Sequence, residues 1–201
     1  MNHKEIHQLQ HLADELIKLP KENEWVEFKT NNKDPKMIGE DISALSNSAA
    51  LLGKVSAYMV WGVEDVNHKI VGTDFKPSVT KHKQQELESW LLQKLEPKID
   101  FHFWEFEYQG FEMVILEIQA AMHKPVRFDG TEYIRIGSYT KKLRDFSEKE
   151  RELWRILDRV PFEKQLALKS VSGEKVLQLL DFVKYFDMTK QPLPDTQQGI
   201  L

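Results

Sequence analysis

Apolar residues recur at helical spacing in two segments near the N-terminus. A repeat of three to four residues places such side chains on one face of a helix. Pro20 follows the first segment, while the second begins with Pro35 and is followed by Gly53, which are typical helix boundaries. We therefore predict two amphipathic helices. Their apolar residues are Ile6, Leu9, Leu12, Leu16 and Ile17 in residues 4–18, and Met37, Ile38, Ile42, Leu45, Ala49 and Leu52 in residues 35–52.

Alternating or continuous apolar runs predict strands. Two pairs of such runs flank Gln109-Gly110 and Asp129-Gly130, which are residue pairs typical of tight hairpin turns. The alternation in residues 100–108 does not indicate which face meets the core. The predicted strands are residues 25–29, 55–63, 69–72, 100–108, 111–119, 126–128 and 131–136, with a turn at Asp65 to His68 before the third of them.

Three further helices complete the predicted element order. They cover residues 81–95, residues 147–157, where Ser147 and Glu150 match a capping box, and residues 176–186. The fold class expected from this order is α+β, with a mostly antiparallel sheet, helices packed on one side and a C-terminal helical extension. We expect one domain in residues 1–160, and in residues 161–201 a helical linker that leads to a further domain downstream.

Composition narrows the class of protein. The 201 residues are 41% hydrophobic and 30% charged, which is typical of soluble globular proteins. No apolar run is long enough to span a membrane and no signal peptide is evident, so we expect a cytoplasmic protein. The absence of cysteine excludes disulfides, thiolate zinc sites and cysteine nucleophiles. Motifs of P-loop ATPases, dinucleotide-binding folds, zinc proteases and serine hydrolases are absent as well.

Positive charge is concentrated in one segment of an acidic chain. The formal net charge is −4, yet residues 123–144 carry six Lys or Arg against two acids. Such a segment is either a surface that faces a polyanion or an ordinary solvated hairpin. The six cations are Lys124, Arg127, Arg135, Lys141, Lys142 and Arg144.

Residues 22–29, with the sequence ENEWVEFK, place acids beside apolar strand residues. Strand alternation puts Glu27 and Lys29 on the same face, roughly 6.5–7 Å apart along the backbone. The two side chains could therefore hold one phosphate or a metal-bound phosphate. The alternative is a solvated strand face with a surface ion pair.

Four motifs, in this order, resemble the AlbA-like domain of the Schlafen superfamily. They are Glu22–Lys29, Ile42–Asn47, Trp61–Asp65 with Ile70–Gly72, and Tyr133–Ser138. The resemblance covers residues 15–150 and implies an α+β nucleic-acid-binding domain of bacterial proteins described as transcriptional regulators. It also implies that the three carboxylates which are catalytic in RNA-cleaving animal Schlafen proteins correspond to Glu22, Glu27 and Asp65.

These considerations give three hypotheses. The first is a domain that binds DNA or RNA, with DNA favoured, and needs no cofactor for binding. The second is an endoribonuclease in which Glu22, Glu27 and Asp65 hold Mg²⁺ or Mn²⁺. The third is a homo-oligomer joined by the helix around Leu177 to Phe186. In the first hypothesis Tyr139 is available to stack on a base, and Arg135 either contacts phosphate or pairs with core carboxylates. The nucleic-acid-binding residues expected are Lys29, Arg127, Arg135, Tyr139, Lys141, Lys142 and Arg144.

Overall fold

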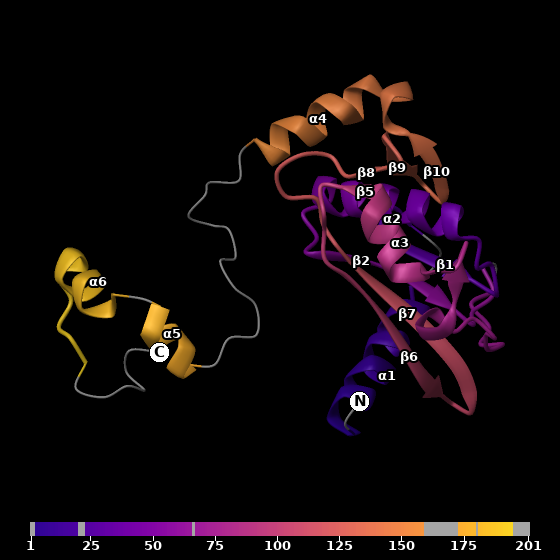
Figure 1. The fold of residues 1–201 in the computed structure, drawn as a ribbon, viewed down its shortest axis with the longest axis horizontal. Helices are drawn as coiled ribbons and strands as arrows, with labels where there is room; N and C mark the ends of the chain where they lie inside the picture. Colours follow the sequence, from indigo (N-terminus) through magenta and orange to yellow (C-terminus); the bar gives the residue numbers. More distant parts are fainter. Residues whose placement is uncertain (1–2, 20–22, 66, 159–172, 180, 195–201) are drawn as a thin grey trace. The chain divides into compact units, whose positions relative to one another are not determined.

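The computed structural model describes residues 3–19, 23–65, 67–158, 173–179 and 181–194. The chain divides into two compact units, Met1–Val160 and Pro161–Leu201. The first unit contains two four-stranded sheets and four α-helices, which confirms the α+β class (Figure 1). Within the described residues no helix is long and apolar enough to cross a membrane.

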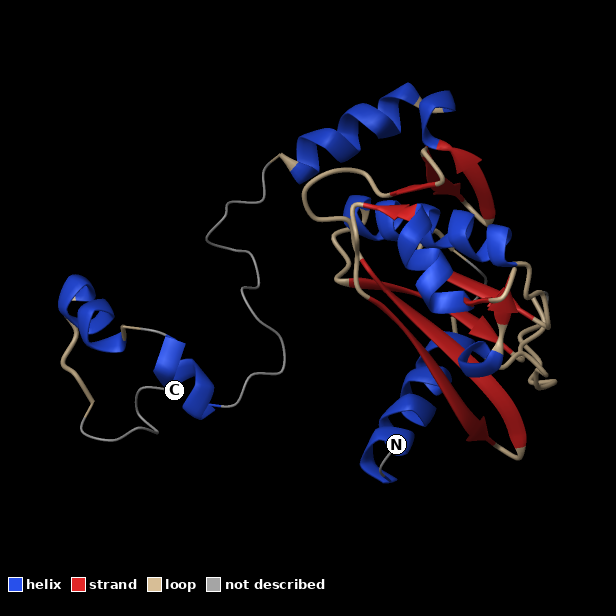
Figure 2. Ribbon diagram, viewed as in Figure 1, coloured by secondary structure: helices blue, strands red, loops and turns tan. Residues whose placement is uncertain are grey.

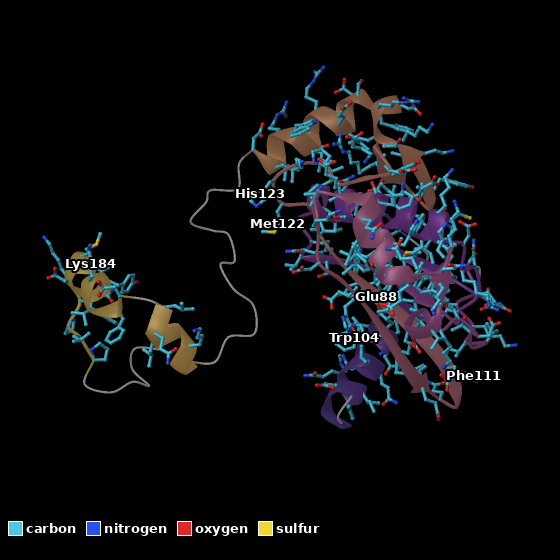
Figure 3. The ribbon with its side chains drawn as sticks, viewed as in Figure 1. Glu88, Trp104, Phe111, Met122, His123 and Lys184 are labelled. Atoms are coloured by element: carbon cyan, nitrogen blue, oxygen red, sulfur yellow. The ribbon has the colours of Figure 1, made fainter. Side chains whose placement is uncertain are left out.

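The first sheet has the strand order β1-β2-β7-β6. β1 (Val26–Lys29) runs parallel to β2 (Ser56–Trp61), whereas β6 (Phe101–Tyr108) and β7 (Phe111–Gln119) form a long antiparallel hairpin. The turn residues Gln109 and Gly110 have φ values of 52° and 81°, as the sequence pattern predicts for a tight hairpin. Phe111 lies at the tip of this hairpin (Figure 3).

The second sheet has the order β10-β9-β8-β5 and is antiparallel throughout. Its strands are β5 (Leu95–Glu96), β8 (Arg127–Phe128), β9 (Thr131–Ile136) and β10 (Tyr139–Lys142). Because β10 is the first strand in this order, one of its two edges pairs with no other strand of the sheet.

Helices cover both faces of the first sheet, so both faces of β6 meet apolar partners. α1 (His3–Ile17) packs with Val26, Phe28 and Phe106 on one face. α2 (Pro35–Leu51) packs with Met59, Trp61 and neighbouring residues on the other. This arrangement explains why alternation within residues 100–108 does not single out a core face. Figure 2 shows the strands and helices of this arrangement in separate colours.

α2 is buried along most of its length and carries polar side chains on the face toward the second sheet. Asn47 donates to the carbonyl oxygens of Val126 and Tyr133, at 2.8 Å each, and accepts from the Val126 amide at 2.7 Å. Ser43 donates to the Val126 carbonyl and accepts from the Tyr133 amide. Ser46 donates to the carbonyl of Gln119 on β7, and Ser48 accepts from the amide of Arg135 on β9. These four side chains are called the α2 polar row.

The third predicted helix, over residues 81–95, is wrong in its first part, because residues 81–86 are not helical. They form a small hairpin of β3 (Lys81–His82) and β4 (Gln85–Glu86), and only Leu87–Lys94 are helical, as α3. The turn residues Lys83 and Gln84 have φ values of 48° and 69°. The segment KHKQQE has no apolar residue that a helix could bury, whereas α3 buries Leu87 and Leu91. After β2, only a bridge between Val63 and Ile70 forms in place of the predicted return strand.

Two other helix predictions need correction. α4 begins at Ser147 and ends at Leu157, as predicted, but its N-terminus has no side-chain cap, so the capping box is not formed. The helix predicted over residues 176–186 is instead two helices, α5 (Gly173–Leu179) and α6 (Phe182–Thr189). Asp181 caps α6 by accepting from the Lys184 amide, which starts a new helix where the apolar pattern predicts a continuous one.

We predict that Gly39→Ala lowers the free energy of unfolding by about 1–3 kcal/mol, because a Cβ at residue 39 would overlap the ring of Phe128. Helix propensity alone favours alanine over glycine by up to about 1 kcal/mol and would make the variant more stable. A loss of stability would therefore show that the contact with Phe128 outweighs helix propensity. Urea unfolding measures it. Adding Phe128→Leu should recover part of the loss, while the exposed control Lys36→Ala should change little. A more stable Gly39→Ala protein would contradict this packing.

Candidate functional site

Four charged side chains form a buried cluster between the two sheets. Arg135 on β9 pairs with Glu27 Oε2, and Lys29 pairs with Glu27 Oε1. Asp41 on α2 lies 3.6 Å from Lys29 Nζ and 3.9 Å from Arg135 Nη1. Thr140 on β10 joins them, since its hydroxyl accepts from Arg135 Nη1 at 3.2 Å and donates to Asp41 Oδ1 at 2.6 Å. These residues are called the charge cluster.

Strand alternation in β1 places Glu27 and Lys29 in this cluster. Val26 and Phe28 point to the α1 side and are fully buried there. Glu27 and Lys29 point to the opposite side, toward α2 and β9, as the sequence predicts. The alternative of a solvated surface pair between Glu27 and Lys29 is wrong, because the Glu27 side chain is only 6% exposed and that of Lys29 only 16%.

Burial and charge act in opposite directions on these groups. Burial raises the pKa of Glu27, while Arg135 and Lys29 oppose that rise. Burial alone would lower the pKa of Lys29, but Asp41 and Glu27 outweigh it, so the pKa of the amine is raised. Lys29 therefore remains a cation at neutral pH. Its charge, together with that of Arg135, offsets the cost of burying the Glu27 carboxylate.

A cavity of about 270 Å³ opens beside the charge cluster. We call it the first cavity. The guanidinium Nε of Arg135 is buried without a hydrogen-bond partner in the described part of the chain. The cavity is lined mainly by charged and polar side chains, together with Tyr139 and Met37. Its lining residues are Glu27, Lys29, Met37, Glu40, Asp41, Arg135, Ser138, Tyr139 and Thr140.

The cations expected to contact nucleic acid fall into three groups. Lys141, Lys142 and Arg144 are exposed on β10 and the following 3₁₀ turn η2 (Leu143–Asp145). Arg127 is held by Glu96, with Nη2 at 2.6 Å and Nε at 3.2 Å from Oε2. The remaining two, Lys29 and Arg135, belong to the charge cluster, so Arg135 pairs with core carboxylates, which was one of its two expected roles.

The aromatic residue expected to stack on a base lies among the exposed cations. Tyr139 is 67% exposed, and Lys141 Nζ lies 5.6 Å from the centre of its ring. Within the described residues neither Lys141 nor Lys142 has an acidic partner within ion-pair distance. Tyr139, Lys141, Lys142 and Arg144 are called the β10 surface.

The three carboxylates expected to hold a metal are placed differently from one another. Glu22 lies outside the described residues, Glu27 is buried in the charge cluster, and Asp65 is exposed in the loop after β2. Both oxygens of Glu27 face cations, which does not fit a ligand for Mg²⁺ or Mn²⁺. Across the described ranges no three His, Cys, Asp or Glu side chains form a metal-binding group. The three-carboxylate site stays a prediction because Glu22 belongs to it.

Asp41, Thr140 and Glu40 belong to the site but were not predicted from the sequence. Asp41 precedes the apolar Ile42 on a helix that is buried nearly all round, and a charged residue in such a position indicates a buried partner. Thr140 gives no comparable signal, because its role depends on the pairing of β10 with β9. Glu40 accepts from the hydroxyl of Tyr133 at 3.1 Å, another contact between residues far apart in the sequence.

Comparison with known proteins gives a family match and several similar solved structures, including the following two. The model of the family described as Schlafen, AlbA_2 matches residues 22–144. The DIP2311 protein from Corynebacterium diphtheriae is 13% identical with a TM-score of 0.45, and the match covers 68% of this chain and 26% of that chain. The N-terminal domain of a RecG-related protein from Nitrosomonas europaea is 21% identical with a TM-score of 0.41. That match covers 66% of this chain and 90% of that chain. No curated protein matches at a significant level.

We predict that Arg135→Met lowers the free energy of unfolding by about 3–5 kcal/mol, because it leaves Glu27 buried beside Lys29 alone. The matched control is Arg127→Met, which breaks an exposed pair and should lower the free energy of unfolding far less. Removing the stranded acid as well, in Arg135→Met with Glu27→Met, should restore part of the loss. Urea unfolding compares the proteins, and equal stability of the two single variants would contradict the cluster.

Proposed function

The chain belongs to the Schlafen AlbA_2 family, and we propose that its first unit binds nucleic acid through the β10 surface. The observation that carries the proposal is the combination of Tyr139 with Lys141 and Lys142, all exposed, on an edge strand. Exposed lysines attract phosphates, and an exposed aromatic ring can stack on a base. The resemblance of the four sequence motifs to the AlbA-like domain supports the same function.

The local charge of this surface differs from that of the whole chain. The formal net charge is −4, but Glu27 and Asp41 are paired with Arg135 and Lys29 of the charge cluster, and Asp145 lies 3.8 Å from Arg144. Lys141 and Lys142 therefore remain available to an external anion. For the whole protein we propose the role of a bacterial transcriptional regulator, for which DNA is the expected polymer.

We predict that Lys141→Gln with Lys142→Gln weakens binding and its dependence on salt. Each lost phosphate contact should reduce the slope of log K against log salt by about 0.9 on duplex DNA or about 0.7 on a single strand. Fluorescence anisotropy with labelled duplex DNA, single-stranded DNA and single-stranded RNA at several salt concentrations measures both quantities. Lys54→Gln with Lys69→Gln removes the same charge elsewhere and is the matched control. Equal affinity and slope in the two double variants would refute the β10 surface as the binding site.

The same mixtures test the nuclease alternative independently. Incubation with Mg²⁺, Mn²⁺ or chelator, followed by denaturing gels, shows whether RNA is cut. The informative variant is Asp65→Asn, because Asp65 is exposed and its substitution leaves the charge cluster intact. Metal-dependent cutting that is lost in Asp65→Asn would support the three-carboxylate site, and cutting that persists would contradict it.

A further inference from the structure

A second cavity, of about 310 Å³, lies beside the first turn of α2. The β3–β4 hairpin, α3 and the turn between β8 and β9 enclose it, so none of the residues expected to bind nucleic acid lines it. It is called the second cavity. Its lining residues are Lys36, His82, Lys83, Trp90, Lys94, Phe128 and Asp129.

Aromatic rings form one wall of the second cavity. The ring centres of His82 and Trp90 lie 4.3 Å apart at an angle of 42°, and Trp90 also contacts Phe128 edge-on at 5.6 Å. Trp90 and His82 are half-buried, and both line the cavity. A half-buried indole held between other rings offers a preformed face on which a nucleobase can stack.

Lysines surround this aromatic wall. Three lysines and one aspartate line the second cavity, which gives it a positive local charge on an acidic chain. Lys94 is already paired with Asp129 at 2.9 Å. Lys83 has no ion-pair partner within the described part of the chain, and Lys36 is 73% exposed, with Glu40 at 3.8 Å. Lys36 and Lys83 are therefore the two amines available to an anion.

The two cavities flank the same end of α2. Lys36 lines the second cavity, while the next residue, Met37, lines the first together with Glu40. Lys36 Nζ lies 3.8 Å from Glu40 Oε1, so the two cavities adjoin at the N-terminal turns of α2. A strand of nucleic acid can pass from one cavity to the other.

We propose that the second cavity is a nucleotide subsite for single-stranded nucleic acid, with a base against Trp90 and a phosphate between Lys36 and Lys83. A base inside a duplex is stacked and paired, so it cannot enter a cavity, whereas an unpaired base can. The strand continues across the N-terminal turns of α2 to the β10 surface. This inference rests on the proposed function and adds to it the strandedness of the ligand and a second contact region.

The test compares Lys36→Gln with Lys83→Asn against the control Lys54→Gln with Lys69→Gln. Asparagine is chosen at residue 83 because it tolerates the positive φ of the turn. Anisotropy with a labelled single-stranded oligonucleotide should show weaker binding by the first double variant and a salt slope reduced by up to about 1.4, that is, about 0.7 for each phosphate contact. Binding to a duplex of the same sequence should match that of the control.

A second readout does not depend on charge. Binding of unlabelled single-stranded oligonucleotide should quench tryptophan fluorescence in the natural protein, and the quenching should be smaller in Trp90→Phe, which keeps an aromatic ring in the wall. Unchanged quenching in Trp90→Phe, or single-strand affinity of Lys36→Gln with Lys83→Asn equal to that of the control, would overturn the subsite. If the double variant Lys141→Gln with Lys142→Gln binds weakly while Lys36→Gln with Lys83→Asn binds like the control, the proposed function stands and this inference fails. If the natural protein binds no nucleic acid, both fail.

Discussion

The structure of the first unit depends on hydrogen bonds from the α2 polar row to backbone groups of β7 and of the chain around β8 and β9. A helix that is buried nearly all round covers backbone amides and carbonyls at the ends of neighbouring strands. Those groups lose their hydrogen bonds to water and need partners within the protein. Asn47 bonds to the amide and carbonyl of Val126 and to the carbonyl of Tyr133, and Ser43 also donates to the Val126 carbonyl. An apolar residue at position 47 would remove the bond that the buried Val126 amide makes to the Asn47 side chain. The polar row therefore fixes how β8 and β9 lie on α2.

The charge cluster follows from this arrangement. Ser48 of the polar row accepts from the backbone amide of Arg135 at 3.0 Å and so fixes the residue from which the guanidinium reaches Glu27. β10 pairs with β9 and brings Thr140 opposite Arg135. The first cavity and the β10 surface are thus positioned by contacts that begin on the buried face of α2. The position of the exposed strand β10 therefore depends on β9, and the position of β9 depends on its hydrogen bonds to α2.

The sequence predicts elements well where periodicity and turn chemistry act locally. The helices α1, α2 and α4 and the hairpins at Gln109-Gly110 and Asp129-Gly130 are confirmed, as is the resemblance to the Schlafen AlbA_2 family. Residues 81–86 were misassigned because a polar segment has no periodicity to interpret, and its turn depends on left-handed backbone at Lys83. The sequence pattern did not predict which side chains surround Glu27, because Asp41 and Arg135 belong to elements that are distant in the chain.

The edge position of β10 has a further consequence for solubility. An edge strand presents unpaired amides and carbonyls, and these can pair with a strand of another molecule. Lysine side chains on such a strand oppose that pairing, because two copies placed edge to edge would bring like charges together. β10 carries Lys141 and Lys142 in only four residues. Whatever ligand the strand meets, these two charges also keep one folded chain from adding to the sheet of the next.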